Sequence, residues 1–125
     1  MKHLVSPLDF SVPELESLLA LGEKIMDNPE QYAHCCAGKK LATLFFEPST
    51  RTRLSFEAAL LDLAGSVLSV SSAASSSASK GESIADTMRI VGNYADVIAM
   101  RHYQEGAAAQ AVRYALCPVI NAGDG

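Results

Sequence analysis

The stretch FFEPSTRTRLSFE at positions 45–57 constrains the fold of this chain more than any other part of the sequence. The apolar run at 41–46, which leads into it, is typical of a buried strand. Pro48 cannot donate a ladder hydrogen bond and keeps the residue before it out of helical geometry, so the strand must end there. Ser49 or Thr50 then caps a following helix. The stretch therefore predicts a strand, a tight turn and a helix.

The start of this helix has the chemistry of an anion site. A first turn leaves backbone N–H groups unpaired, and the helix dipole adds about half a positive charge there. Ser49, Thr50 and Thr52 add hydroxyl donors. Arg51 adds a planar guanidinium that matches two phosphate oxygens at once. A capped helix with solvated arginines is the alternative, but Arg51 and Arg53 both oppose the dipole, and this cost favours a bound anion.

The same stretch resembles the phosphate-binding motif of the transcarbamoylases. FFEPSTRTRLSFE is most similar to the version found in the aspartate carbamoyltransferase family. The ornithine carbamoyltransferases share the S-T-R-T-R core, so the motif indicates the superfamily and leaves the acceptor substrate open.

Composition and charge narrow the class of protein. The chain has 125 residues, the size of one domain, and its 49% hydrophobic and 19% charged residues are typical of a globular protein. It has no apolar run of membrane-spanning length and no signal-peptide core, so we expect no membrane partner and a cytoplasmic location. The net charge of −4 argues against nucleic acid as a partner. Cys35, Cys36 and Cys117 fit neither a disulfide framework nor a zinc site.

Turn signals and hydrophobic periodicity predict alternating helices and strands. Ser11-Val12-Pro13-Glu14 has the spacing of a capping box, and a helical apolar face follows it up to Asn28-Pro29. Beyond the motif we expect strands at 66–70, 96–100 and 118–121, helices at 84–95 and 106–116, and a loop at 122–125. This alternation implies right-handed crossovers and an α/β fold, an open, mostly parallel four-stranded sheet with helices on both faces.

The helix of the motif is predicted in more detail. It carries apolar residues on two sides, a pattern typical of a helix well buried against a sheet. Arg53 and Glu57 are four residues apart and are expected to pair across one turn, which leaves Arg51 for the ligand. Gly65 is expected to close the helix as its C-terminal cap.

Residues 71–79 contain only serine and alanine and lead into Lys80-Gly81-Glu82-Ser83. This composition is typical of a linker, but helical periodicity resumes at once, so a functional loop fits better. The pattern S-S-x-x-x-K-G-E-S resembles a loop of the aspartate carbamoyltransferase family and is absent in this form from the ornithine enzymes. In that family a serine and a lysine of this loop reach the neighbouring subunit's active site, which implies this role for Lys80 and for Ser76 or a neighbouring serine.

Arg101 stands at the end of the predicted third strand. Ligands of open parallel sheets bind beyond the carboxyl ends of the strands, so the 49–52 turn, the 76–80 loop, Arg101 and the 121–124 segment should converge. A solvated residue at a strand end is the alternative. The segment R-H-x-x-E-G also resembles the family, although Tyr103 stands where its members usually carry proline. We expect His102 to be structural.

The whole chain is similar to the amino-terminal, carbamoyl phosphate-binding domain of this family. The resemblance implies carbamoyl transfer from carbamoyl phosphate to L-aspartate, giving N-carbamoyl-L-aspartate and phosphate in pyrimidine synthesis, without a metal or organic cofactor. It assigns carbamoyl phosphate to Ser49, Thr50, Arg51, Thr52, Ser76, Lys80 and Arg101. Arg51 is implied to neutralise the leaving oxygens, Thr52 and Arg101 to polarise the carbonyl oxygen, and Lys80 to complete the pocket from a neighbour. A homotrimer with shared active sites is implied, and a regulatory chain remains open.

We therefore expect residues 1–125 to form a carbamoyl phosphate-binding domain that is truncated at its C-terminal end and lacks the aspartate-binding domain. Such a chain should bind carbamoyl phosphate weakly and turn over little of it. Two alternatives remain: a domain of an ornithine carbamoyltransferase, and a non-catalytic anion-binding or oligomerising fragment.

Overall fold

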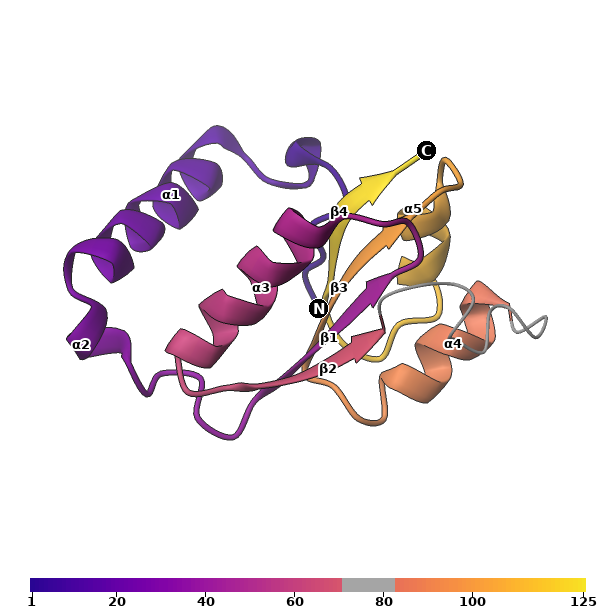
Figure 1. Cartoon of the computed structure of the whole chain (residues 1–125). Coiled ribbons are helices and arrows are strands. Elements are labelled where there is room, and N and C mark those ends of the chain that lie inside the picture. Colours follow the sequence, from indigo (N-terminus) through magenta and orange to yellow (C-terminus); the bar gives the residue numbers. More distant parts are fainter. Residues whose placement is uncertain (71–82) are drawn as a thin grey trace.

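The computed structural model describes residues 1–70 and 83–125 (Figure 1). Helices and strands alternate along most of the chain, as the sequence predicts. In chain order the elements are η1 (Pro7–Asp9), α1 (Val12–Asp27), α2 (Pro29–Tyr32), β1 (Lys40–Phe45), α3 (Thr50–Asp62), β2 (Ser66–Val70), α4 (Ile84–Val91), β3 (Val97–His102), α5 (Ala107–Val112) and β4 (Val119–Asp124).

The four strands form one sheet in the order β2-β1-β3-β4, and all three neighbouring pairs are parallel. Figure 1 shows α3 on one face of the sheet and α4 and α5 on the other. The predicted α/β fold, with a parallel four-stranded sheet and helices on both faces, is confirmed. Since the strands are parallel, their carboxyl ends share one edge of the sheet.

The core lies on both faces of β1, whose side chains alternate between them. Leu41 and Phe45 form one cluster with Ala99, against which Phe56 and Leu60 of α3 pack. The other cluster is larger and joins β1 and β3 to α4, α5 and β4; it contains Ala42, Leu44, Phe46, Met88, Ala95, Ile98, Met100, Ala107, Ala108, Ala111, Cys117 and Val119. A strand buried on both faces explains the continuous apolar run in the sequence.

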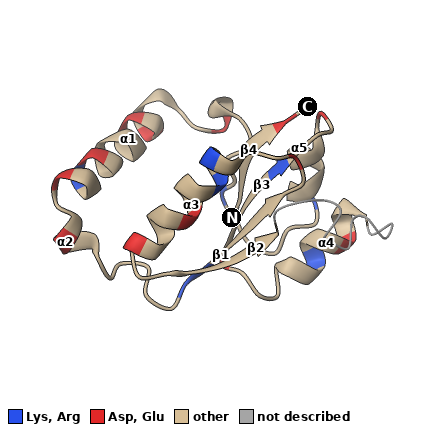
Figure 2. Cartoon of the chain, in the orientation of Figure 1, with Lys and Arg blue, Asp and Glu red and all other residues tan. Residues whose placement is uncertain are grey.

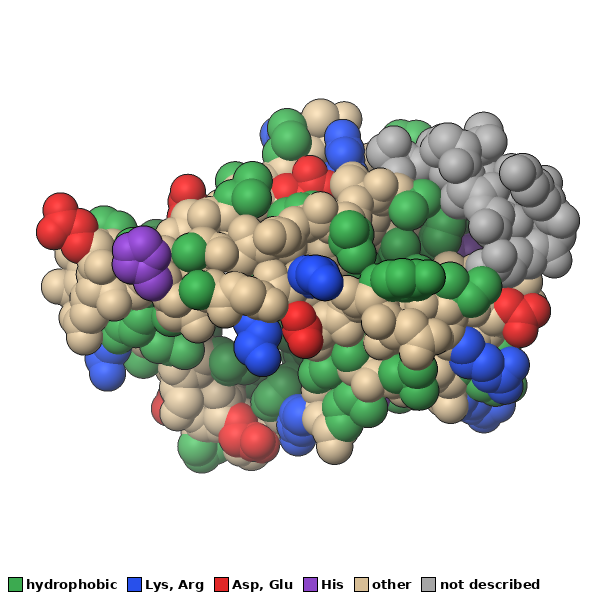
Figure 3. Space-filling view, turned by 90° about the horizontal axis from the view of Figure 1, so that it is seen from below, with side chains coloured by type: hydrophobic (Ala, Val, Ile, Leu, Met, Phe, Trp, Pro, Cys, Tyr) green, Lys and Arg blue, Asp and Glu red, His purple; other side chains and the backbone are tan. Residues whose placement is uncertain are grey.

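The expectation that α3 is well buried is wrong. The helix contains no buried residue, and Leu54 and Leu61 are 52% and 58% exposed. Phe56 and Leu60 pack against the sheet, whereas Leu54 and Leu61 belong to neither core cluster. Helix α1 likewise contains no buried residue. An apolar hollow of about 410 Å³ lies between α1 and α3, and Figure 3 shows hydrophobic side chains at the surface of this half of the molecule.

Several element ends differ from the prediction. Helices α4 and α5 end at Val91 and Val112, earlier than expected, β3 continues to His102, and β4 continues to Asp124, where a loop was expected. The extension of β4 follows a register shift opposite Met100 and His102, after which His102 pairs with Asp124. In the described part of the chain, no helix has the length and apolar character needed to cross a membrane.

Candidate functional site

The turn between β1 and α3 leaves donors unpaired at the carboxyl edge of the sheet. Ser49 is the N-cap of α3, and its side chain makes no capping hydrogen bond in the described structure. The serine caps of the other helices behave differently, because Ser11 and Ser83 each accept a first-turn N–H. The first turn of α3 also contains no acidic residue. Its amides and hydroxyls are therefore available to an external anion.

The two arginines of the motif have different surroundings. The Arg53 Nη1 atom lies 3.6 Å from Glu57 Oε2 and donates to Ser69 Oγ on β2 at 3.0 Å. Glu57 also accepts a hydrogen bond of 2.8 Å from the fully buried Thr43 hydroxyl on β1. The predicted Arg53–Glu57 pair is thus confirmed, and it ties α3 to two strands. Arg51 is exposed, and its guanidinium has no partner among the described residues.

Arg101 lies on β3 beside the end of β1. It pairs in register with Phe45, and its carbonyl accepts from Phe46 N–H at 2.8 Å, directly before the motif turn. Its Nη1 atom donates to the Ala122 carbonyl at 3.0 Å. Its Nε atom is buried and has no hydrogen-bond partner in the described part of the chain. Figure 2 shows basic residues at the first turn of α3 and on β3, near the same end of the sheet.

The end of β4 lies next to Arg101, whose guanidinium donates to the Ala122 carbonyl. The Asn121 Nδ2 atom donates to the Val5 carbonyl at 3.1 Å, and its Oδ1 atom accepts from Gly123 N–H at 2.9 Å. Asp124 Oδ2 accepts from Gly106 N–H at 2.9 Å, which joins β4 to the start of α5. These contacts hold the 121–124 segment against the segment that follows Arg101.

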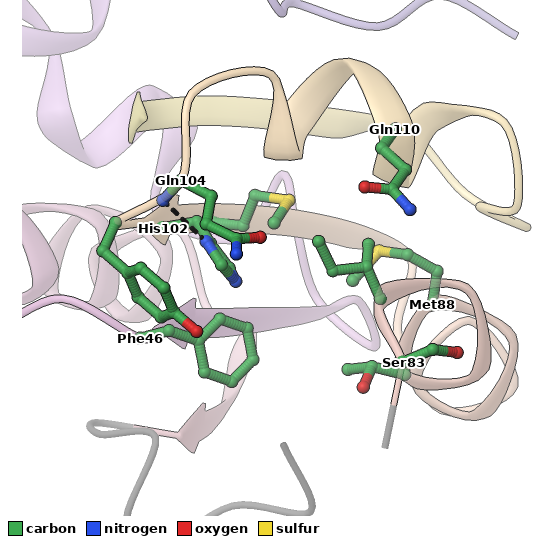
Figure 4. A pocket seen from close by; sticks show the side chains of 10 residues that line it. Phe46, Ser83, Met88, His102, Gln104 and Gln110 are labelled. Atoms are coloured by element: carbon green, nitrogen blue, oxygen red, sulfur yellow. Dashed lines mark hydrogen bonds between the residues drawn. The ribbon is translucent and has the colours of Figure 1, made fainter. Parts of the chain in front are cut away.

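His102 points to the opposite face of the sheet from the motif helix. Its Nδ1 atom accepts from Gln104 N–H at 3.0 Å (Figure 4). Its ring stacks on Tyr103 with centroids 4.4 Å apart. Burial lowers the pKa of the imidazole, while the nearby Asp124 and Glu47 carboxylates oppose that shift. His102 and Tyr103 help to line a cavity of about 290 Å³ between the sheet and α4. These contacts fit a structural histidine.

The structure thus brings Ser49, Thr50, Arg51 and Thr52 to the same edge of the sheet as Arg101. Ser76 and Lys80, the other two residues expected in the site, lie outside the described residues. Sequence reasoning placed the 121–124 segment at this edge and gave it no role, and it missed the contact of Ala122 with Arg101. The sequence contained a signal for this contact, because the glycine-containing segment 122–125 follows the fourth predicted strand, which lies beside the strand of Arg101. No group of His, Cys, Asp and Glu suited to a metal occurs within residues 1–70 and 83–125.

Comparison with known proteins identifies the family of this chain. The family model described as "Aspartate/ornithine carbamoyltransferase, carbamoyl-P binding domain" matches residues 2–125. An aspartate carbamoyltransferase catalytic subunit from Lachnoclostridium phytofermentans is 66% identical over 125 residues, which is all of this chain and 41% of that protein. A second such subunit, from Clostridium novyi, is 59% identical over 124 residues, 99% of this chain and 40% of that protein.

Solved structures agree with the sequence comparison. The catalytic subunit of M. jannaschii aspartate transcarbamoylase superposes with a TM-score of 0.91 at 46% identity, over 98% of this chain and 42% of that one. Aspartate transcarbamoylase from Trypanosoma cruzi, in complex with carbamoyl aspartate and phosphate, superposes with a TM-score of 0.90 at 36% identity, over 99% and 40%. The chain spans about two fifths of the length of these relatives. It belongs to the aspartate/ornithine carbamoyltransferase family, and the part of that family it represents is the carbamoyl phosphate-binding domain.

Proposed function

We propose that this chain is the carbamoyl phosphate-binding part of an aspartate carbamoyltransferase. One observation carries the proposal: the first turn of α3 and the guanidinium of Arg101 lie at one edge of a parallel sheet, and within residues 1–70 and 83–125 the turn lacks a side-chain cap and the Arg101 Nε–H lacks an acceptor. This combination of free amides, hydroxyls and guanidinium groups suits a ligand with phosphate and carbonyl oxygens. The names of the relatives supply the acceptor, L-aspartate.

The proposed reaction joins the amine of L-aspartate to the carbonyl carbon of carbamoyl phosphate. A C–N bond forms through a tetrahedral oxyanion, the C–O bond to phosphate breaks, and phosphate leaves with the bonding electron pair. The amine loses a proton, and the leaving phosphate is the proposed acceptor of that proton. Nitrogen attack on a carbonyl is accelerated by holding the reactants in place and by donors aimed at the developing charges.

Each site residue has a proposed role in this step. The amides and hydroxyls of Ser49, Thr50 and Thr52 hold the phosphate, and Arg51 neutralises the charge that grows on its leaving oxygens. Thr52 and Arg101 polarise the carbonyl oxygen. Lys80, with Ser76, is proposed to reach the site of a neighbouring subunit in a homotrimer. Catalytic roles are thus proposed for Arg51, Thr52, Arg101 and Lys80.

The acceptor distinguishes this proposal from the ornithine enzymes, which share the donor site. The K-G-E-S pattern at 80–83 and the relatives at 66% and 59% identity favour aspartate. We propose that residues 1–125 form the donor-binding domain alone, because the chain spans 41% of its Lachnoclostridium relative. The purified chain should therefore form little or no N-carbamoyl-L-aspartate. Steady formation of this product from carbamoyl phosphate and L-aspartate would overturn that proposal.

Calorimetric titration with phosphonoacetamide, a stable analogue of carbamoyl phosphate, tests the donor site. The chain should bind the analogue, and Arg51→Ala should weaken binding about tenfold or more, because a charge-assisted hydrogen bond is lost. Arg113→Ala is the matched control: it removes the same charge from an exposed position at the end of α5. Equal weakening by both variants would indicate a general charge effect and contradict a site at Arg51.

A further inference from the structure

The end of β4 passes unusually close to the guanidinium of Arg101. Gly123 has a φ of +135°, and a Cβ atom added to it would lie 2.8 Å from Arg101 Nη1 and 3.1 Å from Arg101 Cζ. Real Cβ atoms essentially never approach a non-bonded heavy atom within 3.0 Å. Any other L-residue at this position must therefore displace either the guanidinium or the strand end.

A backbone acceptor fixes the guanidinium next to this glycine. The Arg101 Nη1 atom donates to the carbonyl of Ala122, the residue directly before Gly123. The Nε–H group is buried without an acceptor in the described part of the chain, although leaving a buried donor without a partner is costly. Among the described residues, the guanidinium is thus held against β4 through one nitrogen, and its Nε–H lacks an acceptor that these residues could supply.

The strand end that carries Gly123 is itself held on two sides. Gly123 N–H donates to Asn121 Oδ1, and Asn121 Nδ2 donates to the Val5 carbonyl. Asp124 accepts from Gly106 N–H, and Gly125 N–H donates to the His102 carbonyl at 3.2 Å. A support tied down in this way can fix the orientation of a long side chain that rests on it.

We infer that Gly123 is a positioning residue for the donor site: its missing side chain, together with the Ala122 carbonyl, sets the orientation in which Arg101 meets carbamoyl phosphate. This inference rests on the proposed function, in which Arg101 contacts the ligand. A Cβ atom at Gly123 would have Arg101 atoms as its three nearest neighbours, so Gly123 acts on the ligand through Arg101. A side chain at 123 turns the guanidinium away from the ligand even when the fold is intact.

Gly123 could matter for the backbone alone, and this structural role has to be distinguished by experiment from the positioning of Arg101. The φ of +135° disfavours L-residues whatever lies nearby, so Gly123→Ala also strains the backbone. Gly38, which precedes β1 and makes no contact with the described site segments, provides a first control, because its φ is +81° and a Cβ atom there would have no neighbour within 4 Å. Arg101→Ala provides the second control, since it removes the group with which the new Cβ collides and leaves the backbone strain in place.

The test is a cycle of binding measurements with phosphonoacetamide on the chain and on Gly123→Ala, Arg101→Ala, the double variant and Gly38→Ala. Gly123→Ala should weaken binding about tenfold, and Gly38→Ala by less than about twofold. In the Arg101→Ala background, adding Gly123→Ala should change the affinity by less than about twofold, because residues that act as one unit are not additive. Equal weakening by Gly123→Ala in both backgrounds would show that Gly123 acts through the backbone and would overturn the inference.

Two readouts do not depend on ligand binding. The Nε–H resonance of Arg101 in a ¹⁵N–¹H spectrum should move in Gly123→Ala and stay in place in Gly38→Ala; an unmoved resonance in Gly123→Ala overturns the inference. If Gly123→Ala fails to fold, Arg101→Ala should restore folding in the double variant. A double variant that also fails to fold would overturn the inference. Absence of binding by every form of the chain would instead overturn the proposed donor site, while the Arg101 resonance still decides the role of Gly123.

Discussion

Neighbouring side chains of the same type have different partners in the 49–53 segment. Arg53 is bound to Glu57 and Ser69, whereas Arg51, two positions earlier, is exposed and free of described partners. The sequence predicted this division because only Arg53 has a carboxylate four residues ahead. It could not predict the hydrogen bond from Thr43 to Glu57, which depends on how α3 lies across β1.

Thr43 supplies the first prediction. Its buried hydroxyl donates to Glu57 at 2.8 Å, so Thr43→Val leaves the half-buried carboxylate with one partner fewer. We expect the free energy of unfolding to fall by about 1–2 kcal/mol, the cost of an unsatisfied hydrogen-bonding group. Urea denaturation measures this change. Ser55→Ala, which removes an exposed side-chain hydrogen bond from the same helix, is the control and should have a smaller effect. Similar losses in both variants would contradict a special role for the Thr43–Glu57 bond.

His102 predicts how stability depends on pH. Burial lowers the pKa of His102 in the folded state, so the unfolded chain binds a proton more readily at this position. The contribution of the neutral imidazole is present above the ordinary pKa of about 6.5 and is lost as the pH falls towards the lower folded value. Thermal unfolding between pH 8 and pH 5 should therefore show a steeper loss for the chain than for His102→Asn. Parallel pH profiles of the two proteins would contradict this assignment.

The helices and strands follow the predicted order, but the sequence did not predict how each of them ends. Gly65 was expected to cap α3, but Ala64 is the residue in the left-handed conformation, with a φ of +70°. The N–H groups of Ala64 and Gly65 still close the helix, because they donate to the carbonyls of Leu61 and Leu60. A Cβ atom on Gly65 would lie 2.6 Å from Leu60 Cγ. The glycine was correctly associated with the helix end, but packing rather than backbone conformation requires it.

This arrangement makes a prediction of increased stability. Ala64→Gly relieves an alanine with positive φ and should raise the free energy of unfolding by about 0.5–1 kcal/mol. Ala59→Gly, the same substitution within α3 at an exposed position, should lower it by about 1 kcal/mol. Denaturant titration of both variants gives the two signs directly. A destabilised Ala64→Gly variant would contradict the left-handed helix end.

The sequence predicted that four segments meet at one edge of the sheet; three of them do, and the fourth, the 76–80 loop, lies outside the described residues. Strand order brings the 49–52 turn, Arg101 and the 121–124 segment to one edge, because parallel strands share their carboxyl ends. The exposure of Leu54 and Leu61 was not predictable, since an apolar side of a helix does not specify what covers it. The fit of Gly123 to Arg101 likewise depends on a register shift between β3 and β4.

The proposed sharing of the site between subunits yields the last prediction. If each site combines Arg51 of one chain with Lys80 of a neighbour, Arg51→Ala and Lys80→Ala each damage every site in a pure trimer. In trimers reassembled from equal amounts of the two variants, about a quarter of the sites take both intact residues from different chains. Titration with phosphonoacetamide should then recover about a quarter of the strong sites, and light scattering should give the mass of three chains. A mixture that binds no better than the separate variants, or a chain that stays monomeric, would place Lys80 outside its neighbour's site.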